Sequence, residues 1–469
     1  MNIIHISAEC YPAAKAGGLA DVVGALPKYQ KLLGHKASVI MPFYHNKFRE
    51  SNLFKKVFTG YARMGHATYT FNVLVPKKIK LGYDLFMVDI PGLFDRESIY
   101  SYSDDTERFI AFQIATCNWL NSWESPIDVI HCHDQHTGFI PFMLSKIWEY
   151  RKFENTPTVF TIHNGEYQGQ FGFDKLHYLP PFHSFFNGLV EWKGAINPLA
   201  SAIKCAWRVT TVSPGYMDEI SHSMSGLEEL LRIEREKCVG ILNGIDTDVW
   251  NPETDPMLDV SYGVDNADEG KKAAKDKLCQ QFNLNPKKPL FAFIGRLVKE
   301  KGADILPDVI YHTMTNYTNE QNVLILGSGE SVVENSLLEL EKQFKGNFCS
   351  YIGYNEKLSH EIYAGADFLL MPSRVEPCGL NQLYALRYGT IPIVRRTGGL
   401  RDTVIDMGDA GFGFCHDHCT THDVMHSISR AKSFFKNKKK LAENRKKIMS
   451  IDHSWNKAAD DYIKLYESF

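Results

Sequence analysis

Charged residues and glycines gather between Pro372 and Thr403. The apolar run 367–371 is typical of a buried strand in a parallel sheet, and an arginine, Glu376 and Cys378 follow it before Gly379, where we expect a helix to begin. A second apolar run, 391–394, leads to Thr397, Gly398 and Gly399. Open α/β sheets bind ligands at the carboxyl ends of their strands, where helix N-termini favour anions. The pattern predicts an anion site, most simply for phosphate; the alternative is tight turns with a solvated Glu376.

Three further basic residues also follow predicted strands. Lys15 comes after the strand 2–7 and lies two residues before Gly17, which Gly18 and an amphipathic helix follow. Arg296 and Lys301 come after the strand 290–294. The three-glycine dinucleotide fingerprint and the Gly-Lys-Ser/Thr phosphate loop are both missing, which argues against a nicotinamide dehydrogenase or an ATPase. Cations at strand ends would instead stabilise a departing diphosphate.

Polar residues also end the strand 158–162, where the sequence continues His163, Asn164, Gly165, Glu166 and Tyr167. A histidine in this position is either a structural hydrogen-bond partner or a ligand of the substrate. Its place beside Asn164 on the expected ligand edge of a sheet makes both readings reasonable.

Two clusters resemble metal sites, residues 131–136 (HCHDQH) and residues 415–422 (CHDHCTTH). Neither has the paired ligand spacing of a structural zinc module. In the first, neighbouring side chains of a strand point to opposite faces, so they cannot all reach one ion. We expect no metal in the first cluster and a polar loop in the second; whether Cys415 to Cys419 binds anything stays open.

The composition is that of a globular protein. The chain has 469 residues and is 44% hydrophobic, which is enough for two or three domains. Its formal net charge of −3 argues against the basic surface that a nucleic-acid binder needs. No apolar run is long enough to cross a bilayer, and the N-terminus lacks a basic flank with an apolar region. We therefore expect no membrane partner, a cytoplasmic location and ten reduced cysteines.

Strand and helix patterns alternate along the chain and restart near Gly240. This predicts an α/β fold of two Rossmann-like, doubly wound domains facing a central cleft. The expected N-terminal domain, 1–240, is the acceptor side and is joined by a C-terminal helix, 455–469; the expected C-terminal domain, 241–454, is the donor side. A helix is expected over 227–237, and no helix or strand is assigned to residues 46–83.

Six motifs occur in one order along nearly the whole chain: KAGGL from Lys15, HN with YQG from His163, GILNGID from Gly240, Arg296 with Lys301-Gly302, SRVEPCGL from Ser373 and TGGL from Thr397. Together they resemble bacterial glycogen synthase and plant starch synthase. The resemblance implies the GT-B glycosyltransferase fold and a retaining transfer of glucose from ADP-glucose to an α-1,4-glucan, with release of ADP and without a metal or other cofactor.

The resemblance also implies roles for individual residues. The expected catalytic residues are His163, Glu376, Arg296 and Lys301. The expected donor-binding residues are Lys15, Gly17, Gly18, Asn243, Arg296, Lys301, Glu376, Cys378, Gly379, Leu380, Thr397, Gly398 and Gly399. The expected sugar and acceptor ligands are Asp134, Asn164 and Tyr167.

Two alternatives stay open. No motif reads the base of the nucleotide, so UDP-glucose or another acceptor would suit the same fold; a catalytically silent glucan-binding protein is a further alternative. Gly165-Glu166 and Gly215 depart from the residues common in the family. Oligomeric state, effectors, the preferred acceptor length and the extent of domain closure are not encoded in any motif.

Overall fold

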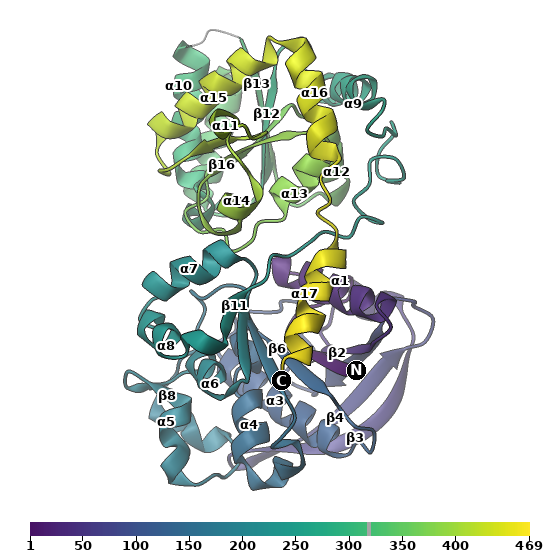
Figure 1. The fold of residues 1–469 in the computed structure, drawn as a ribbon, viewed down its shortest axis with the longest axis vertical. Coiled ribbons are helices and arrows are strands. Elements are labelled where there is room, and N and C mark those ends of the chain that lie inside the picture. The colour runs from purple at the N-terminus through teal and green to yellow at the C-terminus, as the bar shows by residue number, and fades with distance from the viewer. Residues whose placement is uncertain (317–319) are drawn as a thin grey trace. The chain divides into compact units, whose positions relative to one another are not determined.

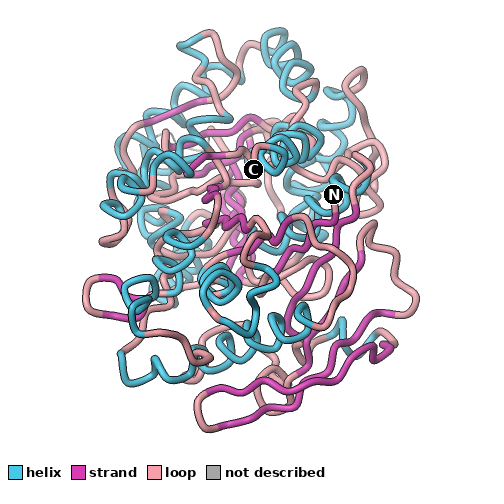
Figure 2. Tube along the Cα trace, turned by 60° about the horizontal axis from the view of Figure 1, so that its bottom comes forward, coloured by secondary structure: helices cyan, strands magenta, loops and turns pink. Residues whose placement is uncertain are grey.

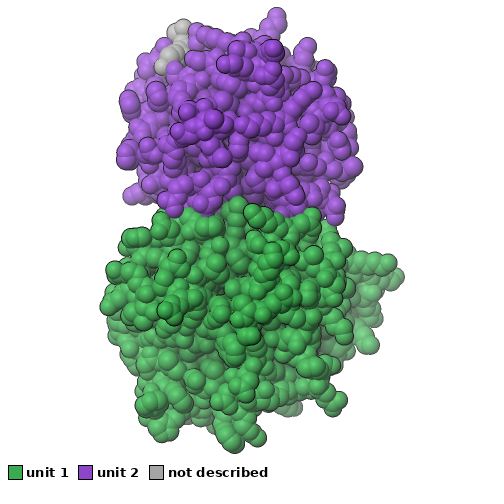
Figure 3. Space-filling model, in the orientation of Figure 1, with its two compact units in different colours: residues 1–243, 455–469 green, residues 244–454 purple. Residues whose placement is uncertain are grey.

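The computed structural model describes residues 1–316 and 320–469. The chain forms two compact units, residues 1–243 with 455–469 (unit 1) and residues 244–454 (unit 2), coloured separately in Figure 3. Unit 1 ends at Asn243, slightly after the boundary expected at residue 240. The last fifteen residues therefore belong to the same unit as the first strand.

Unit 1 is built on a nine-stranded sheet, labelled in part in Figure 1. Its order is β11 (Cys238–Gly240), β10 (Arg208–Thr211), β7 (Thr158–Ile162), β6 (Val129–His133), β1 (Asn2–Ile6), β2 (Lys36–Pro42), β5 (Asp84–Asp89), β4 (Ala67–Pro76) and β3 (Phe54–Met64). The seven strands from β11 to β5 are parallel. The order reverses between β1 and β6, and at such a switch point the loops after neighbouring strands open a crevice for ligands.

The two remaining strands, β3 and β4, pair antiparallel and extend the sheet at one edge. They are the two long neighbouring magenta strands low in Figure 2. Most side chains of β3 are exposed or half-buried, because one of its faces is solvated. Without a continuous apolar run, this hairpin gave no clear signal in residues 46–83.

The helices of unit 1 cover the sheet. They are α1 (Gly18–Leu32), α2 (Lys47–Ser51), α3 (Asp105–Asn121), α4 (Ile140–Lys146), α5 (Asn187–Val190), α6 (Pro198–Cys205), α7 (Pro214–His222), α8 (Glu228–Ile233) and α17 (Trp455–Glu467); a short hairpin joins β8 (Glu191–Trp192) to β9 (Ala195–Ile196). The helix expected over 227–237 is wrong in length: α8 ends at Ile233, and a separate 3₁₀ turn follows at Arg235–Lys237.

The C-terminal helix α17 packs beside α1, as Figure 1 shows in yellow and purple. Trp455, Tyr462 and Ile463 of α17 share one buried apolar cluster with Val22 and Leu26 of α1. Burial of two aromatic side chains contributes several kcal/mol to the stability of this layer. The expected return of residues 455–469 to the first unit is thus seen in the packing.

Unit 2 contains a six-stranded parallel sheet of the order β14 (Phe348–Ile352), β13 (Asn322–Gly327), β12 (Leu290–Ile294), β15 (Phe368–Met371), β16 (Ile391–Arg395) and β17 (Phe414–His416). Its helices are α9 (Ala267–Gln281), α10 (Leu306–Asn316), α11 (Ser331–Gln343), α12 (Glu356–Gly365), α13 (Asn381–Arg387), α14 (Gly398–Thr403), α15 (Thr421–Phe435) and α16 (Lys438–Met449). The strand order reverses between β12 and β15, which is the doubly wound arrangement.

Two apolar clusters form the core of unit 2, and both draw side chains from the same strands. Ala292 and Leu369 contribute to one cluster, whereas Phe291 and Phe368 contribute to the other. Successive strand residues point to opposite faces, so both faces of this sheet are buried. No described helix of either unit is long and apolar enough to span a bilayer.

Candidate active site

The carboxyl ends of β12 and β15 meet in unit 2, and the loops after them bring Lys301 to Glu376. Lys301 Nζ donates to Glu376 Oε1 at 2.7 Å, and Ser373 Oγ donates to Glu376 Oε2 at 2.9 Å. The carboxylate is buried, so its two oxygens depend on these partners. The sequence predicted both residues for one site, and the structure brings them into direct contact.

The glycine pair after β16 packs on the same loop. A Cβ at Gly398 would lie 2.1 Å from the Glu376 carbonyl oxygen, and one at Gly399 would lie 2.3 Å from the Cys378 carbonyl oxygen. Gly399 N–H donates to the carbonyls of Glu376 and Pro377. Glycine is therefore needed here for a close approach between two backbones, and Thr397 beside them is the residue just before the first turn of α14.

Cys378, Gly379 and Leu380 form the turn that leads into α13. Gly379 has φ +69°, a left-handed conformation that favours glycine. The expected helix start at Gly379 is wrong by two residues, because this turn precedes the first helical residue, Asn381. Asn381 Nδ2 donates to the Ile294 carbonyl at 2.7 Å, which fixes the start of α13 to the end of β12.

Arg296 does not join the Lys301 and Glu376 pair in this structure. Its side chain is 53% exposed, and its nearest acidic partner is Glu300 at 3.4 Å. Arg374, the arginine of the same predicted loop, instead forms two bonds to Asp304 and one to the Lys299 carbonyl. Arg374 therefore holds the two loops together, whereas the Arg296 side chain faces solvent.

In unit 1, the loop between β1 and α1 is organised by Glu9, which the sequence reasoning missed. The buried Glu9 carboxylate accepts from the backbone N–H groups of Ala16 (2.5 Å) and Gly17 (2.9 Å) and from the Tyr100 hydroxyl (2.7 Å). Gly18 then begins α1. The position of Glu9 just after β1 at the ligand edge was the available signal.

Lys15 lies in this loop and pairs with Asp21 of α1 at 2.7 Å. Both side chains remain partly exposed, so the ion pair is screened and adds little stability. The ammonium group therefore stays available to another anion.

Asp134 and His163 follow the neighbouring strands β6 and β7 and are joined through the backbone. Asp134 Oδ1 accepts from the His163 N–H at 2.7 Å, and Asp134 has φ +56°, an unfavourable conformation for a residue with a side chain. Burial raises the pKa of the Asp134 carboxyl to about 7, although the N–H groups of His163 and Asn164 act in the opposite direction. Burial lowers the pKa of His163 to about 3, so this imidazole is neutral.

The remaining predicted residues of unit 1 differ in their surroundings. Asn164 accepts from the Glu166 N–H at 3.1 Å, whereas the Tyr167 side chain is exposed. Asn243 is buried, and its Oδ1 has no hydrogen-bond partner among the residues that the structure describes. A buried amide oxygen without a partner costs free energy unless a ligand or water supplies a donor, so Asn243 suits a ligand.

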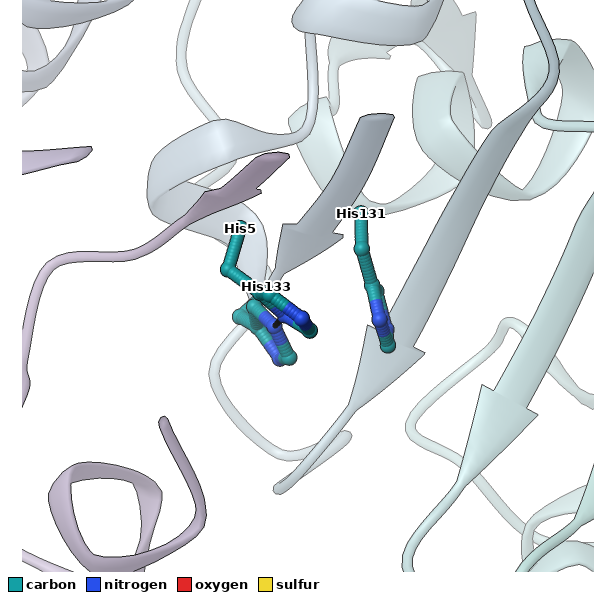
Figure 4. Close-up of side chains that lie close together, drawn as sticks. All are labelled: His5, His131 and His133. Carbon is teal, nitrogen blue, oxygen red and sulfur yellow. Dashed lines mark hydrogen bonds between the residues drawn. The ribbon is translucent and has the colours of Figure 1, made fainter. Parts of the chain in front are cut away.

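Figure 4 shows the one group of three or more potential metal ligands among residues 1–316 and 320–469, formed by His5, His131 and His133. One nitrogen of each lies within 4.8 Å of the other two. The rings of His131 and His133 are stacked at 4.2 Å, with an angle of 25° between their planes. Lone pairs of imidazole lie in the ring plane, so two stacked rings do not point at one ion.

The second sequence cluster lies around the end of β17. Asp417 pairs with Arg396 at 3.0 Å, and Asp423 contacts His422 at 3.3 Å. His416 is buried, and burial lowers the pKa of His416 to about 4. These side chains line a cavity of about 270 Å³ with Arg430.

The family models match the two units separately. Residues 2–233 match the starch synthase catalytic domain, and residues 274–452 match glycosyl transferases group 1. Two doubly wound units of these kinds define a glycosyltransferase of the GT-B fold.

Curated relatives identify the family within this class. Glycogen synthase of Flavobacterium johnsoniae is 52% identical over 99% of this chain and 98% of its own, and that of Thermodesulfovibrio yellowstonii is 38% identical over 99% and 97%. The chain belongs to the glycogen synthase family, and it is a glucosyltransferase that extends a glucan. The predicted family and fold are confirmed.

Solved structures agree with this assignment. The catalytic domain of starch synthase IV from Arabidopsis thaliana, bound to ADP and acarbose, matches with a TM-score of 0.91 at 32% identity, covering 100% of this chain and 99% of that one. Sucrose-phosphate synthase from Thermosynechococcus elongatus matches with a TM-score of 0.64 at 16% identity, covering 100% and 98%, which shows a shared fold alone.

Proposed function

We propose that this protein transfers glucose from ADP-glucose to an α-1,4-glucan and releases ADP, with retention at the anomeric carbon. The bond from that carbon to the diphosphate breaks as its bond to the acceptor oxygen forms on the same face. The acceptor hydroxyl gives its proton to the departing diphosphate. The ADP in the starch synthase IV structure, at 32% identity to this chain, supports the choice of donor.

The observation that carries this proposal is the contact of Lys301 with Glu376 at the switch point of unit 2. An ammonium group has three donors, so Lys301 can keep Glu376 and also bind a phosphate oxygen. Arg296 reaches a phosphate without breaking a buried contact, because its side chain is exposed. Glu376 then holds hydroxyl groups of the transferring glucose, and the backbone around Gly379, Leu380 and Gly398 receives the diphosphate.

Unit 1 supplies groups for the glucosyl residue and the acceptor. His163 is neutral, and its hydrogen bonding suits a sugar hydroxyl rather than a phosphate. The unpartnered Asn243 Oδ1 suits a second hydroxyl. Asp134, Asn164 and Tyr167 are proposed to contact sugar, and Lys15 with the amides near Gly17 and Gly18 to contact the donor.

We also propose that no metal ion takes part. Lys301, Arg296 and Lys15 carry the positive charge that Mg²⁺ provides in other phosphate chemistry. The one group of potential metal ligands in the described chain is a set of histidines whose rings are stacked and hydrogen-bonded.

The first test is nucleotide release by the purified protein, with ADP-glucose or UDP-glucose, with and without glycogen primer, in excess EDTA. We expect primer-dependent ADP release that EDTA does not change. Preference for UDP-glucose would overturn the donor, and a loss of activity in EDTA that Mg²⁺ restores would overturn the metal-free mechanism. No release with either donor would indicate a silent glucan-binding protein, which binding of maltooligosaccharides would then detect.

The Glu9 carboxylate offers a second test in unit 1. Glu9→Ala removes the acceptor for two loop amides and Tyr100, so the loop with Lys15 should loosen and the KM for the donor should rise about tenfold. Steady-state kinetics with the donor varied measures this. Tyr100→Phe is the matched control, since it removes one of the three bonds and should change KM by much less; equal KM values for Glu9→Ala and the unmodified protein would contradict the role.

We propose a cytoplasmic location for the same reaction. All ten cysteines are free, and most are buried, which suits a reducing compartment.

A further inference from the structure

A chain of buried polar side chains runs through unit 1 from the candidate site to its C-terminal helix. Its members come from β1, α1, β6, β7, the loop after β7 and α17, and they are His163, His133, His5, Gln30, Tyr466, His131 and Thr161. Only His163 has a role in the proposed reaction. The other six have no assigned function, and their burial in the core requires the hydrogen bonds that link them.

The links nearest to the site join three imidazoles. His163 Nε2 lies 3.0 Å from His133 Nδ1, and His133 Nε2 lies 3.0 Å from His5 Nδ1. His5 Nε2 then lies 2.8 Å from Gln30 Oε1. Figure 4 shows the His5 and His133 rings side by side, coming from neighbouring strands.

Gln30 connects this chain to α17. Its Nε2 donates to the Tyr466 hydroxyl at 3.3 Å, and Tyr466 lies 2.7 Å from His131 Nδ1. His131 Nε2 continues to the Thr161 hydroxyl at 2.6 Å. Every ring nitrogen of His5 and His131, and both of His133, thus has a hydrogen-bond partner in the protein.

In a chain of hydrogen-bonded neutral imidazoles, all rings donate their hydrogen bonds in the same direction along the chain. Each neutral ring carries one N–H donor and one lone pair, so fixing the first ring fixes all that follow. With the Gln30 carbonyl facing His5, His5 must be protonated at Nε2 and accept at Nδ1. His133 is then protonated at Nε2, and so is His163.

The rings are neutral for the same physical reason. Burial lowers the pKa of His5 to about 4, the side-chain bond to Gln30 acting against it, and holds the pKa of His133 well below its ordinary value. Neighbouring histidines lower the pKa of His133 further, since a second positive charge beside it would be repelled.

We propose that Gln30, His5 and His133 are positioning residues that hold His163 as its Nε2–H tautomer. His163 then presents the lone pair of Nδ1, which makes no hydrogen bond to any described residue, as an acceptor. Resting on the proposed function, we assign this acceptor to a hydroxyl group of the transferring glucose. A fixed acceptor binds a hydroxyl donor and does not attract phosphate oxygens. The glucose therefore binds to His163, whereas the diphosphate binds to other residues.

Histidine nitrogen NMR tests the tautomer directly and needs no substrate. In protein labelled with ¹⁵N-histidine, the signals of His163 are those missing from His163→Gln. We expect a protonated Nε2 and an unprotonated Nδ1 in the unmodified protein. The opposite tautomer, or a mixture, would overturn the proposal.

Gln30→Met removes both polar ends of the amide at similar volume. His5 then loses the acceptor that sets its direction, so His163 should show both tautomers, and kcat/KM should fall about fivefold to tenfold. Gln30→Glu keeps an acceptor toward His5 Nε2–H and should restore the single tautomer. An unchanged His163 signal in Gln30→Met would overturn the role of Gln30.

Gln113→Met is the matched control. Gln113 is also a buried amide of unit 1, and its bonds go to the Phe109 carbonyl and the Phe139 N–H, outside the histidine chain. It should lower stability while leaving the His163 tautomer unchanged. If Gln30→Met does not fold, His5→Phe interrupts the chain one step closer to His163 and should give the same mixture.

The two proposals fail separately. If His163 shows the Nε2–H tautomer but the protein transfers no glucose, the role of the histidine chain would stand and the proposed contact of His163 with glucose would be rejected. If the protein transfers glucose normally but His163 shows the opposite tautomer, the role of the histidine chain would be rejected and the proposed function would stand.

Discussion

Unit 1 is expected to unfold on mild acidification, at a higher pH than unit 2. Five histidines of unit 1 have pKa values that burial holds far below 6.5: about 4 for His5, about 3 for His136 and His163, and well below the ordinary value for His131 and His133. In unit 2, burial lowers the pKa of His416 to about 4 and lowers that of His453.

The direction in which the stability of unit 1 changes with pH follows from proton uptake on unfolding. Below pH 6.5 the unfolded chain protonates these histidines while the folded unit keeps them neutral, so stability is lost as the pH falls toward 4. Asp134 acts in the opposite direction, because its carboxyl, with a pKa of about 7, takes up a proton in the folded state first. A net uptake of about four protons lowers the free energy of unfolding of unit 1 by roughly 5 kcal/mol per pH unit.

Urea unfolding at pH 7.5, 6.5 and 5.5 measures this loss. Tryptophan fluorescence reports mainly on unit 1, which contains Trp119, Trp123, Trp148, Trp192, Trp207 and Trp455, whereas unit 2 contains Trp250. Hydrogen exchange read by mass spectrometry follows both units at once. Equal sensitivity of the two units to acid would contradict the expectation.

His136→Phe provides a matched variant. The His136 ring packs against Tyr100 and Phe109 at centroid distances of 4.7 and 4.4 Å, and its buried Nδ1 has no hydrogen-bond partner among the described residues. Phenylalanine keeps the ring contacts and cannot titrate, so the pH slope should fall by about 1.4 kcal/mol per pH unit. His422→Phe, at an exposed position of unit 2, should leave the slope unchanged.

Lys301→Ala is expected to lower kcat by about 10²–10³. The substitution removes the cation proposed to stabilise the departing diphosphate, and it leaves the buried Glu376 carboxylate with Ser373 as its remaining side-chain partner. Kinetics with saturating donor and glycogen measures the loss, with circular dichroism to confirm folding.

Lys299→Ala is the control for Lys301→Ala. Lys299 is exposed and belongs to the same 3₁₀ turn, Lys299–Lys301, but only its backbone takes part in the contacts that hold the loops. We expect near-normal kcat for Lys299→Ala. Near-normal turnover in Lys301→Ala would remove Lys301 from the proposed mechanism.

The central strands and the loops after them could be predicted from the sequence, because each is a short apolar run that ends in polar or glycine residues. Strand β7 was predicted with its observed ends, Thr158–Ile162, and Lys301 was predicted near Glu376 because both follow strands of one sheet. The order of the strands along the chain and the residues at their ends are thus enough to predict which side chains lie near one another.

Features that depend on tertiary packing were not predictable in the same way. The hairpin β3–β4 has a solvated face and so lacks an apolar run. The partners of Glu9 and the links of His5 to Gln30 join residues whose positions are set only once strands and helices have packed. Gly379 was predicted to begin a helix, whereas its left-handed conformation delays the first helical residue to Asn381.

The return of α17 to unit 1 has a consequence for synthesis. Residues 244–454 form an insertion in the sequence of unit 1, so the ribosome makes all of unit 2 before it makes Trp455 and Tyr462. Until then α1 lacks the apolar contacts that α17 provides, and Gln30 lacks Tyr466. Unit 2 is continuous and can fold during translation, whereas unit 1 waits for the last helix, a period in which chaperones have an exposed surface to bind.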